Sequence, residues 1–320
     1  MILAERFLKG AGWAEIFFIA CYGAVVAFKM QDPMNVPSWR KITWSIFSII
    51  FFAQLIIGLS GFEKFLMTGK LHLPIPMMIL GGPIYRGQLS VMTILFLSTV
   101  VLTGPAWCSQ LCYFGAFDNL ASGGKTSKEI LRNKVAIKST IVVLVIAMAI
   151  FLLWMNIPRL ISTLIAVGFG ITGILIMILF SFKKNKMVHC TMYCPIGTIV
   201  NIVKHVNPFR MYIDKSCTLC MNCTKFCKYD ALNIQDIKNS KPSITCTLCG
   251  DCLAGCHHNS IKYKISKDET GTGQKSVSDS YNQSACCLYR FGKDLIKLNM
   301  RIALVINKRL LYSHMLSTDY

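Results

Sequence analysis

The sequence has few charged residues. Asp, Glu, Lys and Arg make up 15% of the 320 residues, whereas hydrophobic residues make up 53%. Soluble domains rarely reach this balance, and multi-span membrane proteins usually do. The composition therefore excludes an ordinary soluble globular protein over the whole length and indicates a membrane protein.

Acidic residues are especially scarce, with 15 Asp and Glu against 34 Lys and Arg and a formal net charge of +19. A basic protein can bind nucleic acid, but these charges flank apolar stretches and no nucleic-acid-binding motif accompanies them. We therefore expect the basic residues to meet membrane lipid, and we expect no nucleic-acid partner.

Five stretches are long and apolar enough to cross a bilayer, which needs roughly 20 helical residues. They are residues 11–28, 42–62, 89–106, 135–156 and 160–182, of which the third is the shortest. Residues 72–85 are too short and too rich in Pro and Gly to span. We expect an interfacial or re-entrant loop there.

Histidine is also scarce, and none falls within a predicted span. The six are His72, His189, His205, His257, His258 and His314. A transmembrane haem b needs histidine ligands inside the bilayer, so we expect no haem.

Basic residues in the short loops predict the orientation of the spans. With the first residue outside, ten basic residues lie inside and six outside. The inner ones are Lys29, Arg40, Lys41, Lys125, Lys128, Arg132, Lys134, Lys183, Lys184 and Lys186. We therefore expect a multi-pass protein of the cytoplasmic (inner) membrane, with everything after residue 182 in the cytoplasm.

Two cysteine runs carry the strongest chemical signal in the sequence. Both have the C-x2-C-x2-C-x3-C spacing of two-cluster ferredoxins, in which the fourth cysteine of each run ligates the other cluster. One predicted [4Fe-4S] cluster is bound by Cys217, Cys220, Cys223 and Cys256, and the other by Cys246, Cys249, Cys252 and Cys227. A zinc site would instead have separated C-x2-C pairs.

A second cysteine pattern, C-x3-C-x-x-G, occurs twice. Cys108 and Cys112 follow the third predicted span, and Cys190 and Cys194 follow the fifth. The repetition indicates two pseudo-symmetric helical hairpins, each ending in a thiol pair at the inner face. In a helix, residues i and i+4 share a face, so each pair is expected to point both thiols in one direction.

Four converging thiols would supply the ligands of a third [4Fe-4S] cluster. Three alternatives remain for these four cysteines: two redox-active dithiols, a soft-metal site, or a structural role as small buried hydrophobes.

Together, the spans, the C-x3-C pairs and the cysteine runs resemble the NapH family of membrane ferredoxins, related to the membrane parts of NosR and of the copper-linked protein CcoG. The resemblance covers residues 10–265. Residues 190–195 match the family's C-x3-C-P, and residues 108–112 match its first copy. Tyr113 stands where the family has proline, a departure that bears on the local backbone turn.

The resemblance implies electron transfer between the membrane quinone pool and a second ferredoxin or reductase subunit, as the electron-transfer subunit of a quinol dehydrogenase. The relation to CcoG implies an alternative, a maturation factor that reduces or loads a metal such as copper. We assign no catalytic residue.

Several polar residues are candidates for contacting a quinone, although each is also the kind of residue that anchors a helix at an interface. Trp107, Tyr113, Asp118 and His189 lie near the C-x3-C thiols, and Glu15, Glu63, His72 and Arg86 near the opposite face.

The sequence thus predicts an α-helical multi-span domain of about five transmembrane helices over residues 1–205 and an α+β two-cluster ferredoxin-like domain over 206–265. Residues 266–285 have almost no apolar content and indicate a flexible linker. Residues 286–320 predict a basic amphipathic helix that lies on the membrane or docks on a protein. Three cysteines have no ligand spacing: Cys21, Cys286 and Cys287.

Overall fold

The computed structural model describes residues 10–265 except 33, 63–64, 66–74, 90, 124–125, 128, 206 and 208. Internal contacts divide the chain into two units: residues 1–32 with 272–320, and residues 33–271. In the first unit, the described element is α1 (Gly12–Lys29). The predicted linker and amphipathic helix lie outside the described residues and stay predictions.

Among the residues that the structure describes, four helical segments are long and apolar enough to cross a membrane, which indicates a membrane protein. They are α1, α2 (Val36–Leu59), α7 (Lys134–Trp154) and the continuous segment Arg159–Lys184, which joins α8 (Arg159–Ile176), the π-helical turn η4 (Met177–Ser181) and α9 (Phe182–Lys184). They correspond to the first, second, fourth and fifth predicted spans. Their exposed apolar side chains, such as Trp154 and Leu160, suit contact with lipid.

The third predicted span, residues 89–106, is not of spanning length in the structure. Its helix, α4 (Val91–Thr103), has 13 residues, or about 20 Å of helix. A 3-10 turn follows at Gly104–Ala106, where Gly104 adopts a φ of +56°. A Cβ at Gly104 would lie 2.3 Å from the side-chain nitrogen of Asn207, so only glycine fits. Within the described residues the structure therefore supports four spans, and a fifth is not confirmed.

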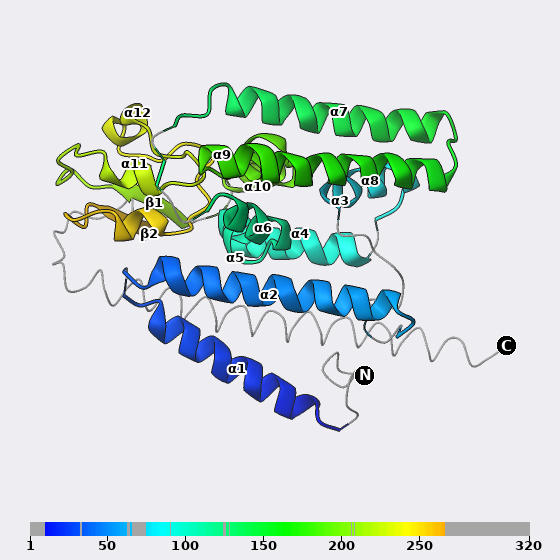
Figure 1. Cartoon of the computed structure of the whole chain (residues 1–320), viewed down its shortest axis with the longest axis horizontal. Coiled ribbons are helices and arrows are strands. Elements are labelled where there is room, and N and C mark those ends of the chain that lie inside the picture. The colour runs from blue at the N-terminus through cyan, green and yellow to red at the C-terminus, as the bar shows by residue number, and fades with distance from the viewer. Residues whose placement is uncertain are drawn as a thin grey trace. The chain divides into compact units, whose positions relative to one another are not determined.

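Although α4 is short, it leads the chain from one end of the bundle to the other. Before it, Tyr85 in α3 (Pro76–Arg86) donates its hydroxyl to the carbonyl of Ile157, in the α7–α8 turn, at 2.6 Å. After it, Ser109 donates to the carbonyl of Thr247, in the cysteine-rich region, at 2.9 Å. Figure 1 shows these two ends of the bundle on opposite sides. The C-x3-C pair at 108–112 is thereby brought beside the cysteine runs.

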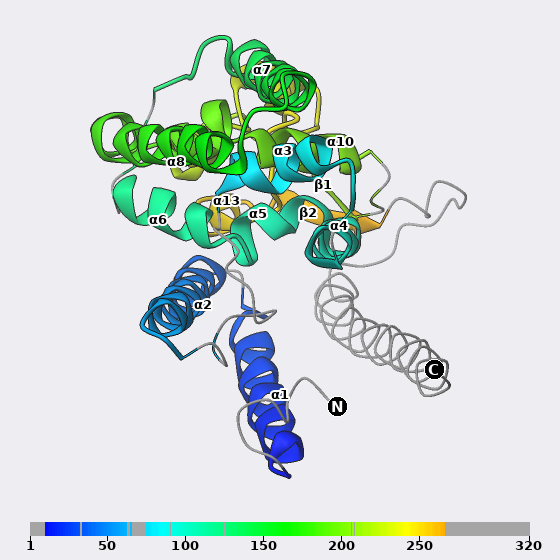
Figure 2. The ribbon, with the colours of Figure 1, turned by 90° about the vertical axis from the view of Figure 1, so that its right-hand side faces the viewer.

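The Pro- and Gly-rich segment at 72–85 forms a short interior helix over the part that the structure describes. α3 has 11 residues and packs against α7, α8 and α10 (Pro195–Val203). Viewed along the bundle in Figure 2, it lies among these helices and α4. Ile75 and Met77 are buried with Val145 and Ala166.

The cysteine-rich region is built on a two-stranded antiparallel sheet that joins its two ends. β1 (Phe209–Ile213) pairs with β2 (Ile261–Ile265), with Phe209 opposite Ile265 and Ile213 opposite Ile261. Between the strands lie three short helices: α11 (Asn222–Phe226), α12 (Ile234–Lys238) and α13 (Asp251–Ala254).

The two cysteine runs repeat in structure as well as in sequence, with an offset of 29 residues from Cys217 to Cys246. Residues with positive φ fall at matching positions of the two copies: Leu219 with Leu248, Met221 with Gly250, and Asp230 with Asn259. Non-glycine residues rarely adopt positive φ, and such strain concentrates where a loop must hold functional groups.

Matching hydrogen bonds tie the two halves of this region together. The amide of Asp214 donates to the carbonyl of Ser260 at 2.7 Å. Ser243 lies 29 positions after Asp214, and Ala231 lies 29 positions before Ser260. The amide of Ser243 donates to the carbonyl of Ala231 at 2.9 Å. The region is therefore pseudo-two-fold symmetric about its α11–α13 contact.

Buried ion pairs fix the cysteine-rich region to the helical bundle. Asp251 pairs with Arg40 of α2 at 2.7 Å. Asp230 pairs with Lys134, at the start of α7, at 2.8 Å and lies 3.6 Å from Lys186, just after α9. The count of basic residues assigns these three cations to inner loops. The structure instead buries them in ion pairs, which place three helix ends beside the cysteine-rich region.

Candidate metal centres

The two C-x3-C motifs adopt the same backbone turn. The first lies across α5 (Trp107–Gln110) and the start of α6 (Tyr113–Ala121), and the second lies across the π-helical turn η5 (His189–Tyr193) and the start of α10. In each copy, the amide of the second cysteine donates to the carbonyl five residues earlier: Cys112 to Trp107 at 3.1 Å, and Cys194 to His189 at 2.9 Å. Such π-type turns are frequent at functional sites.

The second cysteine of each pair is extended and begins a new nine-residue helix. Cys112 has φ −76° and ψ 112°, and Cys194 has φ −68° and ψ 118°. The two cysteines of a pair thus do not lie on one continuous α-helix, and the i, i+4 arrangement expected from the spacing is wrong. Tyr113 occupies the same first helical position as Pro195, so the departure from proline leaves the turn unchanged.

Helix N-termini point at both of these second cysteines. Burial raises the pKa of the Cys112 thiol, while amide hydrogen bonds from Gly115 and Phe114 oppose this rise. Burial likewise raises the pKa of Cys194, opposed by amides of Gly197 and Ile196. Amides at a helix start favour a thiolate, the form that binds metal.

The glycine in C-x3-C-x-x-G permits this turn. A Cβ on Gly115 would lie 2.8 Å from the carbonyl oxygen of Cys108, and one on Gly197 would lie 3.3 Å from that of Cys190. The turn therefore has little room for a side chain at this position in either copy.

All four thiols of the two pairs line one cavity, and we call this group the four-thiol site: Cys108, Cys112, Cys190 and Cys194. Cys108 and Cys194 are buried, and the other two are half-buried. Burial is the main cause that raises the pKa of Cys190, and the other three thiols add to it. The repeats thus converge as the sequence predicts, although the ligand role of these cysteines remains a proposal.

The spacing of the thiols bears on what the site can bind. Within the described part of the chain, no three His, Cys, Asp or Glu side chains are placed to hold one metal ion. The thiolates of a cubane bind four different irons, so they lie farther apart than the ligands of a single ion. The four-thiol site therefore suits a cluster or two separate thiol pairs better than one soft-metal ion with three or four of these ligands.

The cysteines of the runs lie in two sets with the predicted membership, and their role as cluster ligands remains a prediction. The first set, which lines a second cavity, is Cys217, Cys220, Cys223 and Cys256. The second set is Cys227, Cys246, Cys249 and Cys252. After burial, the main causes that raise the pKa of Cys252 are the other three thiols of its set.

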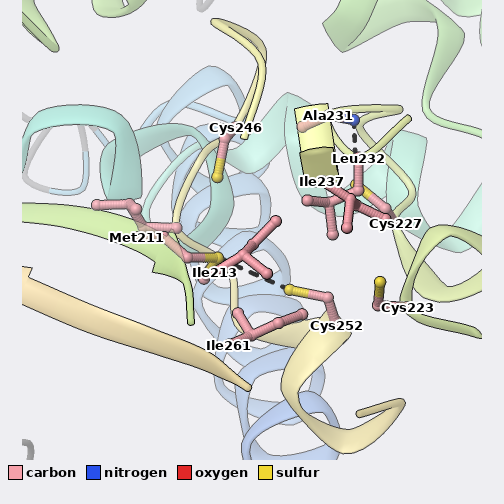
Figure 3. Close-up of a cluster of buried hydrophobic side chains, with 11 residues drawn as sticks. Met211, Ile213, Cys223, Cys227, Ala231, Leu232, Ile237, Cys246, Cys252 and Ile261 are labelled. Atoms are coloured by element: carbon pink, nitrogen blue, oxygen red, sulfur yellow. Dashed lines mark hydrogen bonds between the residues drawn. The ribbon is translucent and has the colours of Figure 1, made fainter. Parts of the chain in front are cut away.

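An apolar core surrounds the thiols of this region. Figure 3 shows Cys223, Cys227, Cys246 and Cys252 among apolar side chains such as Met211. The amide of Ala231 donates to the sulfur of Cys227 at 3.1 Å. Amide-to-sulfur bonds of this kind stabilise thiolate ligands and tune the potential of a bound cluster.

The two sets differ in exposure. The thiols of the second set belong to buried residues, whereas Cys220 of the first set is exposed. The loop around Cys220 is open too, since Thr218 and Leu219 are exposed. The first set is therefore the part of the region that another protein can approach.

The four-thiol site and the second set are bridged by buried side chains. Tyr229 donates its hydroxyl to the carbonyl of Cys108 at 3.3 Å and shares a buried cluster with Cys249, against which Cys190 packs. The Ser109–Thr247 hydrogen bond joins the residue after Cys108 to the residue after Cys246. The second set is therefore the neighbour of the four-thiol site.

The predicted quinone-contact residues fall in different places. Trp107 lines the cavity of the four-thiol site. Asp118 is buried and accepts a hydrogen bond from the amide of Cys190 at 2.9 Å. His189 is buried against Phe114 and Tyr193, and Tyr113 stacks on Phe51.

The candidates for the opposite face are more scattered. Arg86 ends α3, and Glu15 lies in the separate unit that contains α1. Glu63 and His72 lie outside the described residues. These assignments remain predictions.

Sequence reasoning missed the side chains that support the four-thiol site. Trp44 of α2 packs over Gly115 and donates its indole N–H to the carbonyl of Cys112 at 2.7 Å. Lys138 of α7 packs over Gly197 and lines the same cavity. The available signal for Lys138 was a lysine inside a predicted span, since ionisable residues within spans usually serve a function.

Comparison with known families supports cluster binding in the helical part of the chain. A family model described as a 4Fe-4S binding domain matches residues 88–138 and 166–209. Each segment contains one C-x3-C pair, and the cysteine runs from 217 to 256 lie outside both. The chain is an iron–sulfur protein.

The match covers less than half of the chain, and the resemblance to NapH remains a prediction. Searches of curated proteins and of solved structures found no match.

Proposed function

We propose that this protein relays electrons from membrane quinol, through a [4Fe-4S] cluster at the four-thiol site, to two further clusters held by the cysteine runs and on to a redox partner. The observation that carries the proposal is the convergence of four thiols from two repeats, between the spans and the second set. The family match over both C-x3-C pairs supports a cluster there.

The donor set of the four-thiol site fits a cubane. It offers four cysteine sulfurs, the usual ligand count, with helix-start amides at two of them. A cubane held there would supply one-electron transfer. Quinol oxidation releases two electrons and two protons, so two successive one-electron transfers through the site balance the oxidation of one quinol.

The arrangement of the thiol sets supports an order for the relay. Tyr229 and the Ser109–Thr247 bond connect the four-thiol site to the second set. The exposed first set is the end at which a second ferredoxin or a reductase subunit would dock. The order is thus the four-thiol site, the second set, then the first set, in an inner-membrane protein with its cysteine runs in the cytoplasm.

The alternative is a factor that reduces or loads copper. Loading requires a set of soft ligands that closes on a single ion. Within the described residues, no group of three or more His, Cys, Asp or Glu side chains is placed to hold one ion. We favour electron relay because the 4Fe-4S family model matches the segments that contain both C-x3-C pairs.

Addition of a quinol to anaerobic membranes that contain the oxidised protein is expected to reduce the two clusters held by the cysteine runs, which we call the ferredoxin clusters. Electron paramagnetic resonance of reduced clusters, compared with membranes lacking the protein, measures this. Clusters that stay oxidised with quinol yet reduce with dithionite, even when the partner is present, would sink the quinol relay. Copper bound tightly at one ion per chain would favour the alternative.

A further inference from the structure

Lys138 is a buried lysine inside a membrane-spanning helix. It lies in the second turn of α7 and is 5% exposed. Burying an ammonium group away from water is costly unless nearby negative charge compensates it. We therefore expect negative charge near the Lys138 ammonium group when the protein is assembled.

The other buried lysine of the same helix shows what Lys138 lacks. Lys134, one turn earlier, pairs with Asp230 at 2.8 Å. No ion pair joins Lys138 to a carboxylate among the residues that the structure describes. What Lys138 faces instead is the cavity lined by the four thiols.

The ammonium group of Lys138 lies against the second repeat. A Cβ built on Gly197 would lie 2.6 Å from the Lys138 nitrogen, so the group sits against the start of α10, beside Cys194. Its charge lowers the pKa of Cys108 and of Cys194, although burial raises both pKa values more. The lysine thus acts on thiols of both repeats.

The two repeats differ at this point. Trp44 covers Gly115 in the first repeat, where Lys138 covers Gly197 in the second. The pseudo-symmetric scaffold therefore does not require a lysine here, because an uncharged side chain fills the equivalent place.

We propose that Lys138 is the counter-charge of the four-thiol site, and that it raises the reduction potential of the cluster held there so that quinol can reduce it. A cubane with four thiolates is anionic and gains one further negative charge on reduction. A buried cation stabilises the reduced form more than the oxidised form, because charges interact strongly at low dielectric. This inference rests on the proposed cluster at the four-thiol site.

The test is a redox titration of full-length protein, followed by electron paramagnetic resonance, with iron counted in each sample. Lys138→Met removes the charge and keeps a long apolar side chain. Lys138→Arg keeps the charge. Lys184→Met is the matched control, since it removes one charge from a more exposed lysine that lies 3.6 Å from Glu129.

We expect Lys138→Met to keep about twelve irons and to lower the reduction equilibrium constant of one cluster at least tenfold, a shift of about 59 mV for one electron. Lys138→Arg and Lys184→Met should stay near wild type. Loss of about four irons in Lys138→Met, restored in Lys138→Arg, would also support the counter-charge.

An unchanged potential in Lys138→Met with all irons retained would overturn the inference and leave the proposed function standing. Loss of the cluster in both Lys138 variants would also overturn it, because charge would then not be what matters. A wild-type protein with only about eight irons would instead reject the proposed cluster itself.

Discussion

Replacement of Arg40 by methionine is expected to destabilise the attachment of the cysteine-rich region to the spans by about 3–5 kcal/mol, because it leaves the Asp251 carboxylate buried without its partner. Arg40 is fully buried, and two of its guanidinium nitrogens donate to that carboxylate at 2.7–3.2 Å. The third donates to the carbonyl of Ser109 at 3.1 Å, and the guanidinium lies 5.0 Å from the Trp44 ring centroid.

Thermal unfolding and limited proteolysis of purified protein in detergent measure this loss. The matched control is the double variant Arg40→Met with Asp251→Leu, which removes both charges and should recover most of the stability, since apolar pairs often replace buried ion pairs without loss. Equal stability of the single variant and the wild type would show that the pair does not hold the region in place.

Replacement of Cys108 by alanine is expected to abolish reduction of the ferredoxin clusters by quinol while leaving their reduction by dithionite intact. Cys108 belongs to the four-thiol site, and its carbonyl accepts the hydrogen bond from Tyr229 that leads toward the second set. The carbonyl bond survives in alanine, so the variant removes a ligand and keeps the bridge.

The rate of cluster reduction after quinol is mixed with anaerobic membranes measures this effect. Cys21→Ala is the matched control, because Cys21 is exposed in α1 and has no ligand spacing. Reduction of Cys108→Ala at the wild-type rate would remove the four-thiol site from the electron path, whereas a slow Cys21→Ala would point to general damage.

The sequence predicted the long helices well, because hydropathy and length decide them. Its segments 135–156 and 160–182 differ by at most two residues from α7 and from Arg159–Lys184. The span predicted at 89–106 is not confirmed, because α4 ends at Thr103, next to the positive φ of Gly104 and the close side chain of Asn207. That limit depends on a residue about 100 positions away, which hydropathy does not contain.

The thiol groups were predictable from spacing, but their surroundings were not. The pairing of Cys256 with the first run follows from the ferredoxin pattern, and the structure places it in the same cavity as that set. Lys138 and Arg40 come from spans that meet the cysteine-rich region only in the folded chain. Topology counting treats Arg40 as a loop charge, because a count of basic residues cannot distinguish a solvated cation from a docked one.

The most direct test of the central claim is the iron and acid-labile sulfide content of anaerobically purified full-length protein, beside the variant with Cys108→Ala and Cys190→Ala. Three cubanes predict about twelve irons per chain in the wild type and about eight in the variant. A count near eight in both proteins would contradict a cluster at the four-thiol site and leave its cysteines as thiol pairs or structural residues.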